Sequence, residues 1–211
     1  MLLRHGTKCQ LLPAILRDGI IPRAIGSGNW PEVQTRSDLV YLTRHLGHVY
    51  AKQAARNGGT WLIVEVNADL LDEGTFLPDE DFMATEMAHH PREVALRILA
   101  NIRANLEKYR DAYLNRSLRE MGNVAVKAIV PSRAITRYCL IDVSQRIQLA
   151  EYIMPSTQME FPNWLQMNER ITMWLFGDCA TLPNIPGVSA TDLDRESRDR
   201  TGIAVVQVTN H

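Results

Sequence analysis

The sequence predicts an α+β fold, because helix-like and strand-like segments occur along the chain without regular alternation. The clearest strand signal is the compact, β-branched run at 61–66, which is bounded by turn residues. The clearest helix signal follows Pro91, where apolar residues recur every three or four positions over 94–113, the spacing of one helical face. A chain of 211 residues is long enough to bury one sizeable core.

The other elements are expected in chain order. A short apolar strand over 1–4 ends at His5-Gly6-Thr7, and a helix over 11–16 ends at Gly19, since glycine accepts the left-handed conformation that follows many helices. The long helix over 91–118 is followed by Gly122, and a helix that starts near Pro162 ends before Gly177. The remaining helices are expected at 46–56 and 144–152, the remaining strands at 39–42, 124–130, 137–143 and 203–208, and loops at 26–31 and 181–202.

Composition and charge exclude several classes of protein. A net charge of −1 excludes a strongly basic DNA-coating protein. No apolar run approaches the roughly 20 residues that cross a bilayer, and the first residues do not have the layout of a signal peptide. Three widely spaced cysteines (Cys9, Cys139 and Cys179) form no CxxC pair and no even set. We therefore expect a cytoplasmic protein without a zinc site or a disulfide framework.

Three segments occur in a fixed order: LLRHGTKCQLLPAILRDGIIPR, VYLTRHLGHVYAKQAARNGGTWLIVEVNADLLDEGTF and GNVAVKAIVPSRAI. Together they resemble the ADP-ribosyltransferase superfamily, in particular the RNA 2′-phosphotransferases, the poly(ADP-ribose) polymerases and the DarT-type DNA ADP-ribosyltransferases. The resemblance covers residues 1–143. It implies split mixed or antiparallel sheets around an NAD cleft, with helical additions. We expect a single domain over 1–211, in which 144–211 form an extension of open role.

The resemblance also assigns NAD-binding residues. It implies that His5 binds the adenosine ribose, that the backbone of Gly6 pairs with the nicotinamide amide, and that Thr7 supports the ribose. Tyr41 would stack on nicotinamide, and Thr43 would take the place of the family's hydroxyl residue. The His5 and Tyr41 rings are therefore expected to line one crevice. The alternative is that Tyr41 is an ordinary core tyrosine and His5 a surface turn residue.

The catalytic residues are less clear. Arg44 matches in position an arginine that assists catalysis in the DarT-like proteins, although it also fits a surface arginine. At the third catalytic position the family has a glutamate, which holds the 2′-hydroxyl of the nicotinamide ribose. The matching residue here is Asn123, which carries no charge, and Glu120 lies three residues earlier. Glu120 is the preferred candidate, but the acidic stretch 79–86 could supply the carboxylate, or the site could work without a glutamate, as in the RNA 2′-phosphotransferases.

Two other groups of residues could bind a metal ion or nucleic acid. The histidines His45, His48, His89 and His90 lack the spacing of a helical zinc pair, so no metal site is expected. The segment 92–119 is locally basic and fits either a nucleic-acid contact or a solvated helix flank with interleaved acids. Its cationic residues are Arg92, Arg97, Arg103, Lys108, Arg110, Arg116 and Arg119.

These observations lead to one expected function and two alternatives. We expect an NAD-dependent ADP-ribosyltransferase that cleaves the nicotinamide glycosidic bond and transfers ADP-ribose to a macromolecular acceptor, with nucleic acid favoured over protein. One alternative is an enzyme like the RNA 2′-phosphotransferases, although we expect the N-terminal lobe and half the catalytic set of that family to be absent. The other is a non-catalytic module that binds NAD or nucleic acid. The sequence leaves open the acceptor, the oligomeric state and whether the role is that of a toxin, a phage effector or a housekeeping enzyme.

Overall fold

The computed structural model describes six stretches of the chain: 1–22, 36–55, 59–86, 89–142, 160–179 and 202–209. Three sequence predictions lie wholly or mostly outside them: the loops at 26–31 and 181–202 and the helix at 144–152. Within the described residues, no helix has the length and apolar character that crossing a membrane requires.

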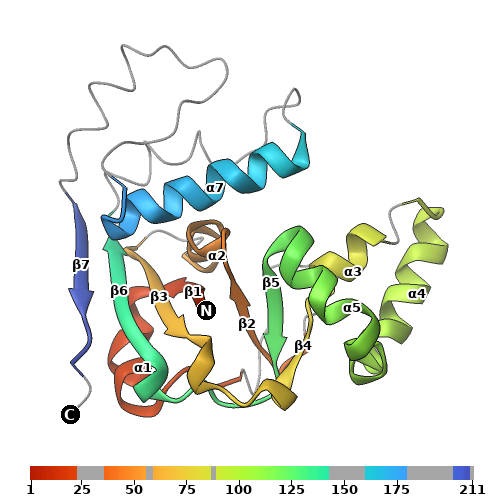
Figure 1. The fold of residues 1–211 in the computed structure, drawn as a ribbon, viewed down its shortest axis with the longest axis horizontal. Coiled ribbons are helices and arrows are strands. Elements are labelled where there is room, and N and C mark those ends of the chain that lie inside the picture. Colours follow the sequence, from red (N-terminus) through yellow and green to blue (C-terminus); the bar gives the residue numbers. More distant parts are fainter. Residues whose placement is uncertain (23–35, 56–58, 87–88, 143–159, 180–201, 210–211) are drawn as a thin grey trace.

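Seven strands form one sheet in the order β4-β5-β2-β1-β3-β6-β7, and every adjacent pair is antiparallel (Figure 1). The α+β class is therefore confirmed, although the strands form one sheet and not two separate ones. The strands are β1 (Leu2–Lys8), β2 (Val40–Thr43), β3 (Trp61–Asn67), β4 (Phe76–Pro78), β5 (Asn123–Val126), β6 (Ile135–Ile141) and β7 (Ile203–Gln207).

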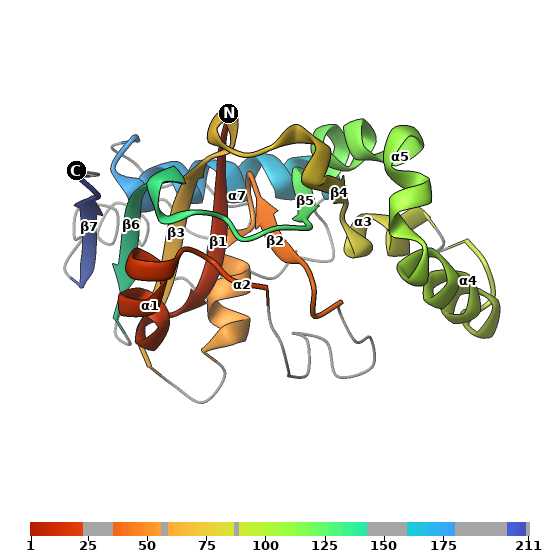
Figure 2. The same ribbon diagram turned by 90° about the horizontal axis from the view of Figure 1, so that it is seen from below.

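The two faces of the sheet carry different cores. On the first face, apolar side chains of β1, β2, β3 and β5 pack together with helix α1 (Leu12–Asp18). On the second face, α2 (Gly47–Ala54) and α7 (Phe161–Phe176) cover β3 and β6. Helices α3 (Glu80–Glu86) and α4 (Arg92–Ala104) share a third core with β5. Figure 2 shows α3, α4 and α5 (Arg110–Arg116) as a lobe at the end of the molecule away from β7.

The junction between β1 and β2 has the shortest ladder in the centre of the sheet. Along β1 and β3, seven consecutive residues are paired, whereas β1 and β2 share one paired position, Arg4 with Thr43. Beyond that position, Nδ1 of His5 lies 3.0 Å from the carbonyl oxygen of Tyr41. A carbonyl oxygen only accepts hydrogen bonds, so Nδ1 of His5 carries the proton and donates it.

Strand β1 runs through His5-Gly6-Thr7, so the prediction that these residues form a turn after a short strand is wrong. The physical reason is the packing of α2. A Cβ atom on Gly6 would lie 2.0 Å from the carbonyl oxygen of Gly47 and 2.4 Å from the nitrogen of Ala51. Glycine is therefore required here by close contact with a helix backbone, and not by a turn conformation.

The long helix predicted over 91–118 is divided. Helix α4 ends at Ala104, a 3-10 segment covers Leu106–Tyr109, and α5 follows. The one step of three in the apolar pattern, from Leu106 to Tyr109, coincides with the 3-10 segment, whose hydrogen bonds join residues three apart. The predicted apolar face is confirmed, because its residues from Ile98 to Tyr113 pack in one core. Strand β4 and helix α3 were not predicted.

Candidate functional site

Five polar residues form a row across five adjacent strands on the second face of the sheet. The strand registers pair Asn123 with Thr43, Thr43 with Arg4, Arg4 with Glu65, and Glu65 with Arg137. Residues paired in this way share a face of the sheet. The burial of the row is high, since Thr43 is 0%, Asn123 1% and Glu65 2% exposed. Such burial is costly unless the polar groups are paired, so the partner of each atom matters.

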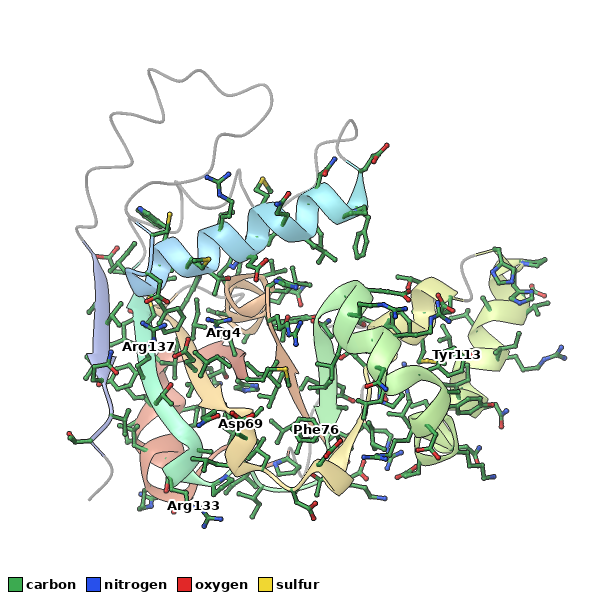
Figure 3. The ribbon with its side chains drawn as sticks, in the orientation of Figure 1. Arg4, Asp69, Phe76, Tyr113, Arg133 and Arg137 are labelled. Atoms are coloured by element: carbon green, nitrogen blue, oxygen red, sulfur yellow. The ribbon has the colours of Figure 1, made fainter. Side chains whose placement is uncertain are left out.

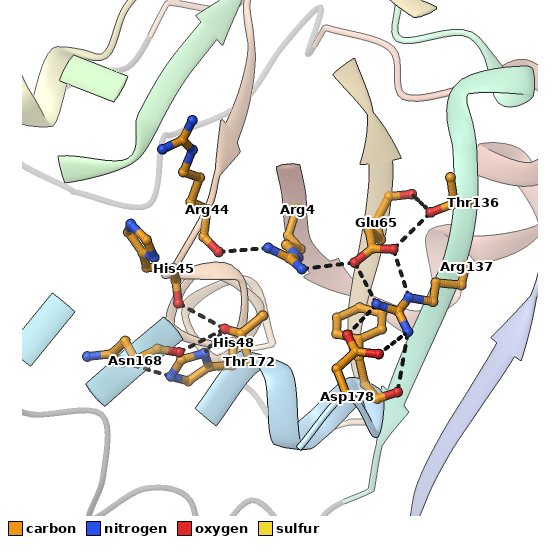
Figure 4. Close-up of polar contacts among 11 residues, drawn as sticks. Arg4, Arg44, His45, His48, Glu65, Thr136, Arg137, Asn168, Thr172 and Asp178 are labelled. Carbon is orange, nitrogen blue, oxygen red and sulfur yellow. Dashed lines mark hydrogen bonds and ion pairs between the residues drawn. The ribbon is translucent and has the colours of Figure 1, made fainter. Parts of the chain in front are cut away.

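Glu65 is fully paired. Its carboxylate accepts hydrogen bonds from Arg4 Nη2 at 3.0 Å and from Arg137 Nε at 2.7 Å (Figure 4). Thr136 Oγ1 donates a further bond at 3.0 Å, and Arg137 also binds Asp178 just after α7. Both guanidinium groups lie against the ring of Phe176, the last residue of α7. Figure 3 labels Arg4 and Arg137 below α7. This half of the row joins the sheet to α7.

The other half of the row contains two polar atoms that lack a hydrogen-bond partner among the described residues. Thr43 Oγ1 accepts the backbone N–H groups of His45 and Leu46 and so holds the chain at the start of α2. By contrast, Arg4 Nε and Asn123 Oδ1 are buried and have no hydrogen-bond partner among the described residues. A buried donor and a buried acceptor without partners, on either side of Thr43, are the features expected where a ligand or ordered water binds.

Asn123 connects to acidic residues through Tyr50 of α2. Asn123 Nδ2 donates to the Tyr50 hydroxyl at 2.7 Å, and that hydroxyl donates to Asp81 Oδ2 at 3.3 Å. Burial raises the pKa of Tyr50 well above its usual value, and the negative charges of Asp81 and Asp79 act in the same direction. Tyr50 therefore keeps its proton. Burial likewise raises the pKa of Asp79 well above its usual value, with the charge of Asp81 adding to the effect.

The structure places the His5 ring against the backbone of Tyr41 and not against the Tyr41 ring. His5 is paired with Val64, whose side chain belongs to the core of the first face. Tyr41 is two residues from Thr43 and is paired with Ala125, so its ring lies on the second face with the core of α3 and α4. The two rings are on opposite faces, and the expectation that they line one crevice is wrong. Thr7, buried on β1, follows His5 on the first face.

Tyr41 lies in a different polar group. Burial raises the pKa of its hydroxyl, and the charges of Glu80 and Asp79 add to this. Glu80 is itself buried, and its Oε1 lies 3.3 Å from Arg103 Nε. Arg103 lines an open surface cavity of about 380 Å³ together with Arg36, Ala100 and Ala104. The charge of Asp79 acts on Tyr41 as well as on Tyr50, so this group adjoins the residues that are linked to Asn123.

The remaining predicted residues lie at the edge of the site or outside it. The Arg44 backbone oxygen accepts a bond from Arg4 Nη1, while the Arg44 side chain contacts the sulfur of Met1. Glu120 forms ion pairs with Arg116 and Arg119. These contacts, together with its position on the exposed side of 117–121, are those of a surface charge and keep Glu120 out of the row.

Most cations of the basic segment are paired with acids. Arg103 pairs with Glu80, Arg110 with Asp111, Arg116 with both Glu86 and Glu120, and Arg119 with Glu120. This pattern is that of a solvated helix flank. Among the described residues, no group of three or more His, Cys, Asp or Glu side chains is arranged to hold a metal ion.

Sequence reasoning missed three residues of the site. Glu65 had a visible signal, because it is the lone charge inside the apolar strand 61–66. Tyr50 was expected only as an inward-facing residue of its helix. Arg4 stands next to His5, and which of the two faces the site depends on the strand register, which the sequence alone does not reveal. Asp81, by contrast, belongs to the acidic stretch that was one of the three alternatives.

Comparisons with known proteins find little. No family model matches the chain, and no curated protein matches it. Among solved structures, the chain is similar to one described as EcPltA, with a TM-score of 0.34 and 13% sequence identity, over 68% of this chain and 78% of that chain. Similarity at this level supports no inference about fold or function.

Proposed function

We propose that the chain is an NAD-dependent ADP-ribosyltransferase, which cleaves the nicotinamide glycosidic bond and transfers ADP-ribose to a macromolecular acceptor. The supporting observation is the polar row. The three segments that resemble the superfamily supply the adjacent strands β1, β2 and β5, and they contribute Arg4, Thr43 and Asn123 to one face. Opposed side chains on neighbouring antiparallel strands lie about 5 Å apart. Arg4 and Asn123 are two strands apart, with Thr43 between them, so roughly 10 Å separates them, and a ligand as long as a dinucleotide can contact both.

The chemistry of these residues fits NAD. The unpaired donor at Arg4 Nε matches a ligand acceptor such as a phosphate oxygen, and the unpaired acceptor at Asn123 Oδ1 matches a ligand hydroxyl. A dinucleotide offers both groups, and NAD supplies a labile glycosidic bond to nicotinamide. In this proposal Arg4 binds an oxygen of the ligand and Asn123 orients a hydroxyl, while Thr43 holds the start of α2 in place. Stacking of Tyr41 on nicotinamide stays a prediction.

The test is release of free nicotinamide from NAD. We expect release by the wild-type protein, and unchanged release by Glu120→Gln, because Glu120 is engaged in surface ion pairs. Asn123→Ala removes the unused acceptor and should slow release by about 10²-fold, the usual effect of losing one preorganised polar contact in an active site. Equal rates for Asn123→Ala and wild type, or a loss in Glu120→Gln alone, would refute this placement.

A non-catalytic NAD-binding module is the second candidate, and one observation favours it. The third position of the row is occupied by an amide and not by a carboxylate, so no negative charge stands there to oppose a developing positive charge. Calorimetric titration with NAD separates the two candidates. Binding without nicotinamide release, in the presence of RNA, DNA and protein acceptors, would establish the module and exclude the enzyme.

The acceptor proposed is nucleic acid, on the strength of the resemblance. The assay therefore has three acceptor arms, an RNA oligonucleotide, a DNA oligonucleotide and a protein mixture, and the measured quantity is covalently attached ADP-ribose. A fourth arm uses a 2′-phosphorylated RNA oligonucleotide. Formation of cyclic ADP-ribose phosphate in that arm alone would show the phosphotransferase reaction instead.

A further inference from the structure

Five residues of the second face form a closed ring of hydrogen bonds. Asn123 Nδ2 donates to Tyr50, and Tyr50 donates to Asp81 Oδ2. The backbone N–H of Asp81 donates to Asp79 Oδ1 at 2.8 Å, and the backbone N–H of Asp79 donates to Ser117 Oγ at 3.1 Å. Ser117 Oγ then donates to the carbonyl oxygen of Asn123 at 2.7 Å, which closes the ring.

Every bond in this ring runs in the same direction, so each residue donates to the next one. At Tyr50 and Ser117 the same hydroxyl both accepts and donates, and hydrogen bonds linked through one group polarise and strengthen one another. The ring also ties together elements that are distant in the sequence: α2 through Tyr50, the start of α3 through Asp79 and Asp81, and the entry of β5 through Asn123. Ser117 and Asn123 are both buried, which protects the ring from competition by water.

The direction of the ring determines which atom of the Asn123 amide is free. A phenol has one proton to donate, and the Tyr50 hydroxyl donates it to Asp81 Oδ2. The Tyr50 oxygen then accepts from Asn123, and only the Nδ2 end of the amide donates. The opposite orientation would place the amide oxygen against a phenol oxygen whose proton is already used. Oδ1 is therefore the end left without a partner.

We propose that Tyr50 and Asp81 are positioning residues that hold the Asn123 amide with Oδ1 toward the ligand, and so select a ligand that presents a hydroxyl donor at this point. The inference rests on the proposed NAD site. The ligand hydroxyl concerned is the 2′-hydroxyl of the nicotinamide ribose. Neither Tyr50 nor Asp81 contacts the ligand in this arrangement, and both act through Asn123.

The experiment compares the affinities of NAD and of its analogue without that 2′-hydroxyl, measured by calorimetry. Wild type should bind NAD about tenfold more tightly than the analogue, the ratio that one hydrogen bond of ordinary net strength gives. Tyr50→Phe removes the link to Asp81, and Asp81→Ala frees the Tyr50 proton for the amide oxygen. In both variants the ratio should fall to about one, because NAD then loses the hydrogen bond that the analogue never forms.

Matched variants separate positioning from general loss of structure. Asp81→Asn retains a side-chain oxygen that accepts the Tyr50 proton, so it should keep the tenfold ratio. Tyr113→Phe, in a ring packed against Phe82, and Asp111→Ala, at an exposed side chain, should also keep it. A ratio that stays near tenfold in both Tyr50→Phe and Asp81→Ala would overturn the proposal.

The side-chain amide of Asn123 provides a readout that does not depend on NAD. In NMR spectra of the wild-type protein without ligand, the bond to Tyr50 should change the chemical shift of one Nδ2 proton of Asn123 and slow its exchange with solvent. Tyr50→Phe should abolish this protection. If wild type binds neither NAD nor its analogue, the proposed function fails. The signals of the Asn123 side-chain amide then test by themselves whether Tyr50 holds this amide in place. Identical amide signals in wild type and Tyr50→Phe would contradict that role.

Discussion

Gly6 lies where α2 crosses β1 with no space for a side chain. We predict that Gly6→Ala lowers the free energy of unfolding by about 3 kcal/mol, because the added Cβ would meet the backbone of α2 at Gly47 and Ala51. Gly74→Ala is the matched control, since its Cβ would come no closer than 3.3 Å to a side-chain oxygen of Asp72. Chemical denaturation of both variants measures the difference. Equal stability of the two would show that α2 does not pack as described.

Glu65 compensates two guanidinium groups that are largely buried. Glu65→Gln keeps the size of the side chain but removes its charge, so Arg4 loses its only acidic partner in the described part of the chain. We predict a loss of about 3 kcal/mol of unfolding free energy, at the lower end for a broken buried ion pair because both arginines keep some exposure. Asp111→Asn, at a side chain that is 96% exposed, should change stability by less than about 0.5 kcal/mol.

Helices α2 and α7 are joined by a buried histidine. His48 Nε2 lies 2.8 Å from Asn168 Oδ1, and His48 Nδ1 lies 3.4 Å from the hydroxyl of Thr172 (Figure 4). Burial lowers the pKa of His48 to about 4, although the bond to Asn168 acts in the opposite direction. At neutral pH the imidazole is uncharged, so the joint between the two helices contains no charge at this point.

This joint should weaken in acid. Below its unfolded pKa of 6.5, His48 takes up a proton in the unfolded chain but not in the folded one, so acidification stabilises the unfolded state. We predict that His48 lowers the free energy of unfolding by about 1.4 kcal/mol for each pH unit of acidification between pH 6.5 and about 4. Denaturation curves of wild type and His48→Gln over this range provide the check. Parallel pH dependence in the two proteins would contradict the neutral buried imidazole.

Elements with a strong local signal were predictable from the sequence, and those that depend on distant contacts were not. The strand at 61–66 was predicted from its β-branched composition, the helix ended by Gly177 from the residues at its two ends, and the apolar face from Ile98 to Tyr113 from spacing. Strand β4 has three residues, and α3 begins directly after it, so neither element is long enough to show a period. The continuation of β1 through Gly6 depends on α2, more than forty residues away.

For the molecule as a whole, strand register decides which residues form the site. Pairing of Arg4 with Thr43 places Arg4 and Asn123 on one face and turns His5 to the other, because neighbouring residues of a strand point to opposite faces. Through the resemblance, the sequence predicted Thr43 and Asn123 as residues of one site. It could not predict that the residue before His5 would face them, nor that the acidic stretch would reach Asn123 through Tyr50.

The most direct test of the central claim is the structure of the protein crystallised with NAD. The account predicts that the dinucleotide lies on the second face of the sheet, with an oxygen on Arg4 Nε and a ribose hydroxyl on Asn123 Oδ1. NAD on the opposite face beside His5, or in the cavity lined by Arg36 and Arg103, would contradict it.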